Sequence, residues 1–155
     1  MTGTIETRLR NLGIDLPPSA PAAANYVPFV VSGNHVFVAG QLPMLDGKVA
    51  ITGKLGDGVS LEDGQTAARL CALNLLAQAK SAGNGDLDRI TRCIKLGGFV
   101  NAAPDFAEHP QVLNGASNLM TEVLGDAGRH ARFAAGAASL PFNATVEVDG
   151  IFELN

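Results

Sequence analysis

The sequence predicts an α+β domain in which two main helices cover one face of a mixed β-sheet. Segments with the period of two of a strand alternate along the chain with segments that have the 3.6-residue period of a helix. Their order is strand pair, helix, strand, helix, strand pair. The 155 residues, 46% of them apolar and 17% charged, are enough for one domain with its own core.

We interpret residues 1–21 as an extension that precedes a single domain, residues 22–155. A short amphipathic helix is expected at its start, because apolar residues recur there at helical spacing and Gly13 follows them. They are Ile5, Leu9 and Leu12. Three prolines then predict an extended connector, since proline disfavours helix in the residue before it. These are Pro17, Pro18 and Pro21.

The first two strands are expected over residues 26–31 and 35–38, which are rich in Val, Phe and Tyr. A turn-forming tripeptide at residues 32–34 separates them, so the two strands should form a hairpin. The stretch from there to Gly58 is rich in turn residues and predicts a loop with one short strand.

A long helix should begin after Ser60, because Asp63 three residues later completes a pattern that resembles a capping box. It should run to about Ser81, where Gly83 ends it. Its apolar stripe is Ala68, Cys71, Leu75 and Ala79.

Residues 88–101 predict a long strand, in which the pair Gly97-Gly98 indicates a β-bulge. Cys93 falls on the face opposite the apolar one and is expected toward a subunit core or a cleft. The apolar face is Ile90, Ile94, Leu96 and Val100.

Pro110 can open a second helix that runs to Leu124, and Gly125 occupies the position of a C-terminal cap. Its core face is Val112, Ala116, Leu119, Met120 and Val123. Two β-rich runs follow, residues 129–138 and 144–154. We expect them to form a second hairpin across residues 140–143.

Charge and composition argue against several classes of partner. The net charge is −4 and the 11 basic residues are scattered, so no nucleic-acid partner is expected. No stretch approaches the roughly 20 apolar residues of a membrane helix, and no signal segment is seen before Arg10, so we expect a cytoplasmic protein with no membrane partner. The His and Cys spacings fit no metal site or disulfide framework.

The candidate chemistry lies in the last two strands. Arg132 is the long charged side chain of a small apolar run, residues 131–138, where it needs a partner. Glu147 lies on the following strand and can be its neighbour. A guanidinium can hold a carboxylate with two hydrogen bonds, and a carboxylate can position water or accept its proton. A plain ion pair on a wet sheet face explains the same two residues, so chemistry alone leaves both interpretations open.

The spacing of these residues resembles the signature of the RidA/YjgF family. In that family an Arg begins a strand, a Leu-Pro pair follows, and a run of Val or Ile around a Glu closes it, as in Arg132, residues 140–141 and residues 146–148. The resemblance keeps the same order of elements over residues 22–153. Its other matching segments are residues 38–43 and 100–106.

The resemblance implies a bacterial chorismate mutase-like fold and a homotrimer with a barrel-like core and ligand clefts between subunits. It also implies hydrolysis of 2-aminoacrylate-like enamines and imines to 2-keto acids and ammonia, without a metal or organic cofactor. Arg132 would hold the carboxylate of the imino or keto acid, and Glu147 would position water. Further ligand contacts would come from Tyr26, Ala39, Gly40, Asn114 and Ala134.

Two of these positions depart from the family's best-known pattern, since Ala39 replaces a Ser and Ala134 replaces a Cys. Both changes make the pocket less polar and leave the substrate open. His130 shares the face of Arg132 and fits either the site or a solvated strand end. Two other functions stay open: a trimer that binds a small carboxylate without turnover, and a ribonuclease or translation inhibitor, which the net charge disfavours.

Overall fold

The computed structural model describes residues 3–155, so Met1 and Thr2 of the assigned extension lie outside the described residues. A five-stranded sheet runs in the order β1-β2-β9-β7-β8. Within this sheet β7 and β8 are parallel and the other neighbouring pairs are antiparallel, so the sheet is mixed. Its strands are β1 (Phe29–Ser32), β2 (His35–Gln41), β7 (Ile90–Asn101), β8 (Ala131–Ala137) and β9 (Val146–Leu154).

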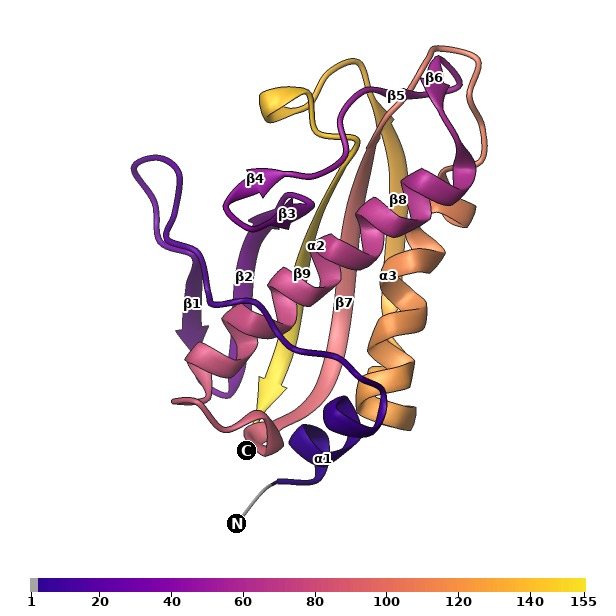
Figure 1. Cartoon of the computed structure of the whole chain (residues 1–155). Coiled ribbons are helices and arrows are strands. Elements are labelled where there is room, and N and C mark those ends of the chain that lie inside the picture. The colour runs from indigo at the N-terminus through magenta and orange to yellow at the C-terminus, as the bar shows by residue number, and fades with distance from the viewer. Residues whose placement is uncertain (1–2) are drawn as a thin grey trace.

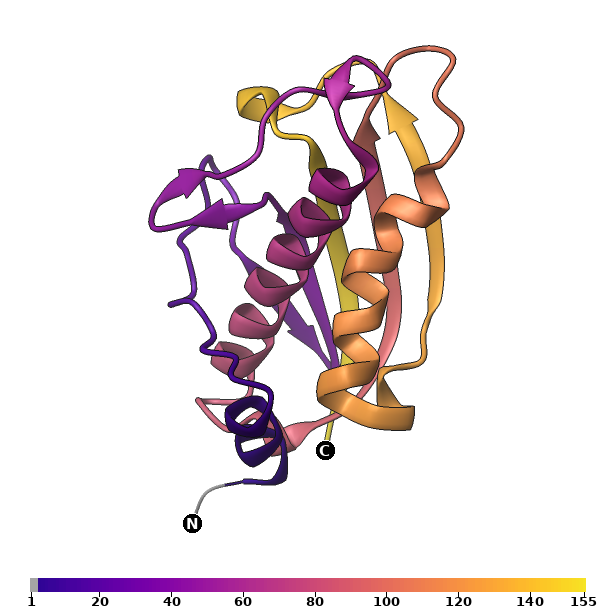
Figure 2. The same cartoon turned by 45° about the vertical axis from the view of Figure 1, so that its right-hand side comes forward.

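Two long helices, α2 (Leu61–Ala82) and α3 (His109–Leu124), lie side by side on one face of the sheet, in front of it in Figure 1. The predicted class, with two main helices on one face of a mixed sheet, is therefore confirmed. A short helix, α1 (Thr4–Asn11), lies below the other helices, near the C-terminal end of β9 (Figure 2). The 3₁₀ turns are η1 (Leu87–Arg89), η2 (Gly125–Gly128) and η3 (Pro141–Asn143).

Local sequence signals set the ends of both long helices. The hydroxyl of Ser60 accepts a hydrogen bond from the N–H of Asp63 at 3.1 Å, which is the predicted N-terminal cap of α2. Pro110 lies in the first turn of α3. Backbone N–H groups in a first turn have no hydrogen-bond partner within the helix, so the N–H that proline lacks is not missed there. Gly125 ends α3 with a φ of 65°, a conformation that favours glycine.

The core fills the space between the two helices and the sheet. The predicted apolar stripes of α2 and α3 are buried, and the sheet contributes Leu96, Val148 and Phe152, all fully buried. Burial of each such large side chain contributes about 1.5–3 kcal/mol. The core therefore fixes which face of each strand points to the helices.

One carboxylate anchors the N-terminal helix α1. Asp88 accepts hydrogen bonds from the N–H groups of Thr4 at 2.7 Å and Ile5 at 2.9 Å. A negative charge is favoured at this end of a helix, because the N–H groups of its first turn lack partners. Ile5 is buried, so α1 packs onto the end of the core.

The predicted final hairpin is wrong. β8 and β9 do not pair, because β7 lies between them, parallel to β8 and antiparallel to β9. β9 buries Val146, Val148 and Phe152 completely, which suits a strand in the middle of a sheet. β8 has small residues and lies at the edge. Burial, rather than closeness in sequence, decides which strands pair.

The segment before α2 is more ordered than the predicted loop with one short strand. It contains two small pairs of strands. These are β3 (Met44–Leu45) with β4 (Lys48–Val49), antiparallel, and β5 (Lys54–Leu55) with β6 (Gly58–Val59), parallel.

The irregularities of β7 lie before Lys95, not at Gly97-Gly98 as predicted. They turn Cys93 into the core, where it is fully buried, so the expectation of a subunit core or cleft for this thiol is wrong. Gly98 is instead a point of close approach, since a Cβ there would collide with Leu113 of α3.

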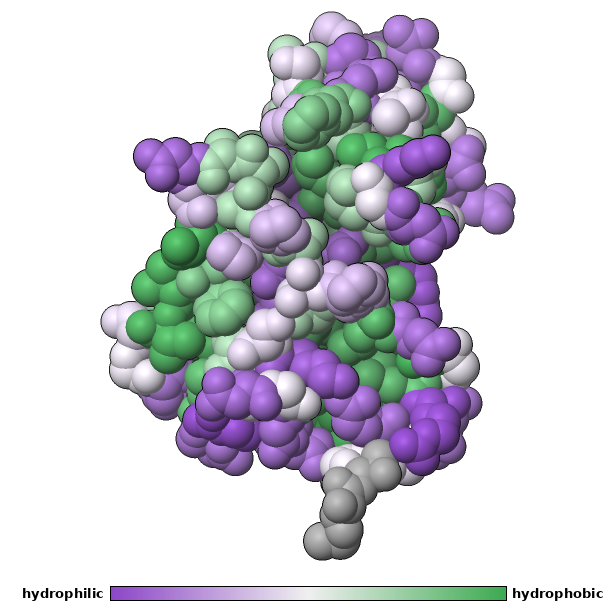
Figure 3. All heavy atoms as spheres, turned by 60° about the vertical axis from the view of Figure 1, so that its left-hand side comes forward, coloured by the Kyte–Doolittle hydropathy of each residue, from purple (hydrophilic) through white to green (hydrophobic). Residues whose placement is uncertain are grey.

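The sheet face opposite the helices carries exposed apolar side chains. Val30, Phe37, Phe99 and Phe133 are between 41% and 52% exposed. The rings of Phe99 and Phe133 meet edge to face, with centroids 5.5 Å apart. In Figure 3, where the edge formed by β1 turns toward the reader, hydrophobic residues gather along the left side of the molecule. Apolar areas of this kind mark interaction surfaces.

Candidate functional site

Arg132 lies on the edge strand β8, and its side chain is held against α3. Its Nη1 donates to Asn114 Oδ1 and to Ser117 Oγ, both at 3.0 Å. Its Nη2 donates to the carbonyl oxygen of Pro110 at 3.3 Å. One helix thus supplies three acceptors for the guanidinium, and all three are neutral groups.

Ser117 is held in turn by His130. The Nδ1 atom of His130 lies 2.6 Å from the carbonyl oxygen of Gly128, which can only accept, so Nδ1 carries the hydrogen. In the neutral imidazole Nε2 then accepts the hydroxyl hydrogen of Ser117 at 2.8 Å. This chain of hydrogen bonds fixes the orientation of Ser117 and, through it, of Arg132.

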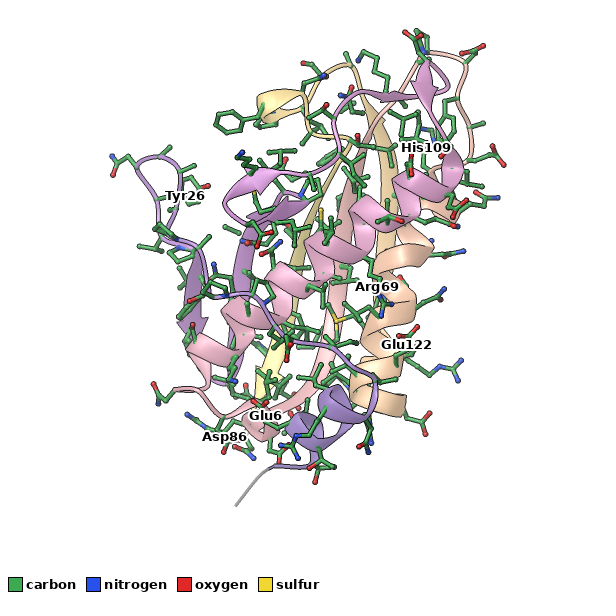
Figure 4. All side chains as sticks on the ribbon, viewed as in Figure 1. Glu6, Tyr26, Arg69, Asp86, His109 and Glu122 are labelled. Atoms are coloured by element: carbon green, nitrogen blue, oxygen red, sulfur yellow. The ribbon has the colours of Figure 1, made fainter. Side chains whose placement is uncertain are left out.

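The charge of Arg132 is not neutralised by a carboxylate within residues 3–155. The ion pairs that the structure gives for these residues are Arg69 with Glu122 and Lys80 with Glu6; Figure 4 labels the first pair, on α2 and α3. Burial lowers the pKa of Arg132, but a guanidinium stays protonated at neutral pH. Its positive charge is therefore available to an anion.

Ala134 lies two residues after Arg132 on β8 and shares its face of the sheet. We call Asn114, Ser117, His130, Arg132 and Ala134 the guanidinium cluster. It brings together three of the residues that the resemblance assigned to the ligand. Those three are Arg132, Asn114 and Ala134.

A second group forms around Glu147 on β9. β2 bulges opposite this strand, with one extra residue at Ala39-Gly40. A Cβ on Gly40 would lie 2.8 Å from Glu147 Oε1, so only glycine lets the carboxylate occupy this position. We call Ala39, Gly40, Glu147 and Asp149 the carboxylate cluster.

Glu147 is half-buried, whereas Asp149, two residues farther along β9, is exposed. Burial raises the pKa of Glu147, and the charge of Asp149 raises it further. The pKa of Asp149 is also raised, chiefly by burial. A carboxyl with a raised pKa exchanges protons more readily near neutral pH, which is the property that acid–base catalysis requires.

A cavity of about 610 Å³ opens beside the carboxylate cluster, and both Gly40 and Tyr26 line it. Tyr26 lies on the loop that leads into β1 (Figure 4) and is 51% exposed. Pockets of about 300–1,000 Å³ are typical of small-molecule sites. The cavity is therefore large enough for a metabolite.

One chain does not bring the two clusters together. Arg132 pairs in register with Leu96 of β7, and Glu147 pairs with Phe99. Leu96 is buried under the helices, whereas Phe99 lies on the exposed face, so the two charged side chains leave the sheet on opposite faces. Their strands are also separated by β7, which adds about 10 Å at the usual strand spacing. The expected contact across a hairpin is therefore absent from the single chain.

Sequence reasoning did not single out Ser117 or Asp149. Ser117 follows Asn114 by three residues on α3 and therefore lies on the same face of the helix. Asp149 follows Glu147 by two residues on β9 and shares its side of the strand. Both spacings are visible in the sequence, but only the fold shows that these faces carry the candidate site.

The two thiols are unsuited to nucleophilic chemistry. Both are buried, and burial raises the pKa of Cys71 and raises that of Cys93 to about 12. Over residues 3–155 there is no cluster of three or more His, Cys, Asp or Glu side chains that could hold a metal ion. None of the helices in the described part of the chain has the length and apolarity needed to cross a bilayer.

Comparison with known proteins gives close relatives along the whole described chain. Residues 6–154 match the family model described as "YjgF/chorismate mutase-like, putative endoribonuclease". The Trypanosoma cruzi "Protein TCP17" is 49% identical over 155 residues, which is 99% of this chain and 96% of the relative. A crystal structure of an Agrobacterium tumefaciens protein of unknown function is 57% identical, with a TM-score of 0.91 over 97% of this chain and 92% of that one. A crystal structure of a "putative endoribonuclease" from Shewanella oneidensis MR-1 is 39% identical, with a TM-score of 0.93 over 98% and 100% of the two chains.

Proposed function

The chain belongs to the YjgF/chorismate mutase-like family, and we propose that it hydrolyses reactive enamines and imines related to 2-aminoacrylate to 2-keto acids and ammonia. The family and the fold expected from the resemblance are thereby confirmed. The family's description is compatible with binding of a small molecule and with an endoribonuclease-like role. The observation that favours a small carboxylate is Arg132, because its guanidinium is held by three neutral acceptors and keeps its charge for an anion.

In the proposed reaction, Arg132 holds the substrate carboxylate, flanked by Asn114 and the backbone at Ala134. An enamine first takes a proton from solvent on its terminal carbon and becomes an iminium ion. Water then adds to the C=N carbon as Glu147 accepts a proton from it, and Glu147 passes this proton to the nitrogen of the carbinolamine. The C–N bond breaks and ammonia leaves, while the C=O bond forms and the hydroxyl proton returns to solvent. Water is the only co-substrate in this balance.

The site proposed here is shared between two subunits of a homotrimer. Two features support this arrangement: one chain places the guanidinium and carboxylate clusters on opposite faces of the sheet, and the face that carries Glu147 exposes apolar side chains. Contact between two different patches of identical chains produces a ring when the rotation closes. The number three comes from the family resemblance.

The deciding experiment is release of 2-keto acid from imino acids that an amino acid oxidase generates in the assay. The wild-type protein should accelerate release, and Arg132→Ala should lose the acceleration while its circular dichroism and melting temperature stay unchanged. Arg69→Ala, which removes a surface arginine of the pair with Glu122, is the matched control. Full activity in Arg132→Ala would overturn the proposed role of this residue.

A binding protein without turnover is the second candidate, because Arg132 alone suffices to hold a carboxylate. It is favoured if wild-type protein binds 2-keto acids, loses that binding in Arg132→Ala, and accelerates hydrolysis of no imine. Ribonuclease activity is the third candidate and rests on the family's description. Against it stand a net charge of −4 and scattered basic residues. Cleavage of RNA that survives Arg132→Ala would favour it.

A further inference from the structure

The cavity beside Gly40 has a mostly apolar wall. One side is the connector over residues 20–28, and another is the β3–β4 hairpin with Met44. Phe142 of η3, 73% exposed, borders the cavity from a distant part of the sequence. Lys48 is the one charged residue among those that line it. A wall of this kind suits a hydrocarbon group rather than a second charged group.

Two buried polar side chains of α2 hold these walls in place. Gln78, 1% exposed, donates a hydrogen bond to the carbonyl of Ala20 in the connector at 2.7 Å. Asn74, one turn earlier and 5% exposed, donates to the carbonyl of Met44 in β3 at 3.1 Å. Burying an amide costs free energy unless the amide forms a hydrogen bond, so each of these contacts holds one wall of the cavity in a fixed position. The cavity is thus built into the fold.

We propose that this cavity receives the side chain of the substrate, and that the protein prefers imines of 2-amino acids with large apolar side chains. The inference rests on the proposed imine hydrolysis. Gly40 links the cavity to the proposed catalytic carboxylate, because it lines the cavity and also lies against the side chain of Glu147. A substrate whose imine carbon faces Glu147 therefore has its side chain at the mouth of the cavity.

Size gives the direction of the preference. The side chain of 2-aminoacrylate is a single methylene and leaves almost all of the cavity of about 610 Å³ empty. An additional methylene in an apolar pocket changes kcat/KM by about tenfold or more. Imines with a branched aliphatic or an aromatic side chain should therefore exceed the three-carbon imine in kcat/KM by at least roughly tenfold.

The test measures binding apart from turnover, with the whole protein. Isothermal titration would compare pyruvate, 4-methyl-2-oxopentanoate and phenylpyruvate, which carry the same 2-keto acid group on side chains of increasing size. The corresponding imines would be compared in the hydrolysis assay. We expect affinity and kcat/KM to rise from the first compound to the other two, and Arg132→Ala to weaken binding of all three.

A matched pair of variants tests the cavity itself. Ala22→Phe places a ring in the lining, whereas Ala24→Phe makes the same change two residues away on an exposed position outside it. Ala22→Phe should cancel the preference for large side chains, so that the two larger keto acids no longer bind more tightly than pyruvate. Ala24→Phe should behave like the wild type. Equal behaviour of the two variants would overturn the assignment.

The outcomes separate this inference from the proposed function. If the wild type hydrolyses imines of every size equally well, the side-chain cavity is wrong and imine hydrolysis stands. If it binds the larger keto acids more tightly but hydrolyses no imine, hydrolysis is wrong and the side-chain cavity stands. Hydrolysis that favours the three-carbon imine would overturn the assignment of the cavity to the substrate side chain.

Discussion

The hydroxyl of Ser117 accepts a hydrogen bond from Nη1 of Arg132 at 3.0 Å. His130 orients that hydroxyl, because its Nε2, 2.8 Å away, accepts the hydroxyl hydrogen and leaves the oxygen lone pairs facing the guanidinium. A neutral acceptor of this kind orients the arginine without cancelling its charge. The pair joins helix α3 to the edge strand β8 at the point where the proposed substrate carboxylate binds.

Ser117→Ala should weaken carboxylate binding and leave the fold intact. Loss of a hydrogen bond to a charged group costs about 1.5–3 kcal/mol, so KM for the imine and Kd for the keto acid should rise roughly tenfold or more, with a smaller change in kcat. Thr121→Ala is the matched control, since its hydroxyl donates to the Asn118 carbonyl within the same helix. Equal effects of the two variants would mean that Ser117 only supports the helix.

Gly40→Ala should lower kcat by at least about tenfold while Arg132 still binds keto acids. The new Cβ would lie 2.8 Å from Glu147 Oε1, so the carboxylate must move away from the water that it positions. Thermal denaturation of the double variant Gly40→Ala/Glu147→Ala gives the control, because removing the carboxylate should relieve the loss of stability caused by the alanine. Wild-type turnover in Gly40→Ala would contradict the proposed role of Glu147.

Asp149→Asn should extend activity to lower pH. Glu147 must be ionised to accept a proton from water, and its raised pKa means that activity is full above that value and falls as the pH drops through it. Removal of the Asp149 charge, the second cause of the raised pKa, lowers that pKa and moves the acid limb of kcat/KM to lower pH. Glu153→Gln, farther along β9, is the control. If the acid limb of kcat/KM does not move, a group other than Glu147 controls it.

Mixing two inactive variants should restore activity if each site takes Arg132 from one subunit and Glu147 from its neighbour. Arg132→Ala and Glu147→Gln chains, exchanged by mild unfolding and refolding together, form some sites with both native residues. With equal amounts, each residue is intact in half of the chains, so roughly a quarter of the wild-type activity should return.

The same exchange within each single variant is the control and should restore nothing. Equilibrium sedimentation of the mixture should give the mass of a trimer. No recovery from a mixture that has exchanged its subunits would mean that no site combines Arg132 of one subunit with Glu147 of another, and would overturn the shared site.

Local signals in the sequence predicted the ends and the apolar faces of the two long helices correctly. Ser60 caps α2, Gly125 ends α3, and the apolar stripes of both helices are buried, because each depends on residues within a few positions of one another. Strand pairing depends on distant segments instead. The strand order, with β7 between β8 and β9, depends on how all five strands bury their apolar faces together. No short segment of the sequence contains that information.

In the candidate site, too, the features that depend on local sequence were predicted and those that depend on distant segments were not. Arg132 stands out in the sequence as a charge within a small apolar run, and the structure explains how it is held by α3. Its expected proximity to Glu147 assumed a hairpin, and the parallel pairing of β7 with β8 removes it. The cavity wall joins residues 20–28 with Phe142, and segments so far apart in the sequence give no local signal.

β9 lies at the centre of the sheet although it is the last of the five strands along the chain. During synthesis β2 and β7 therefore emerge from the ribosome with the edges that β9 will join still unpaired. Such edges can pair with other nascent chains, and the long-range contacts that close the sheet form late. The five-stranded sheet can therefore close only after residues 146–154 have been made, and until then the edges of β2 and β7 stay open to other nascent chains.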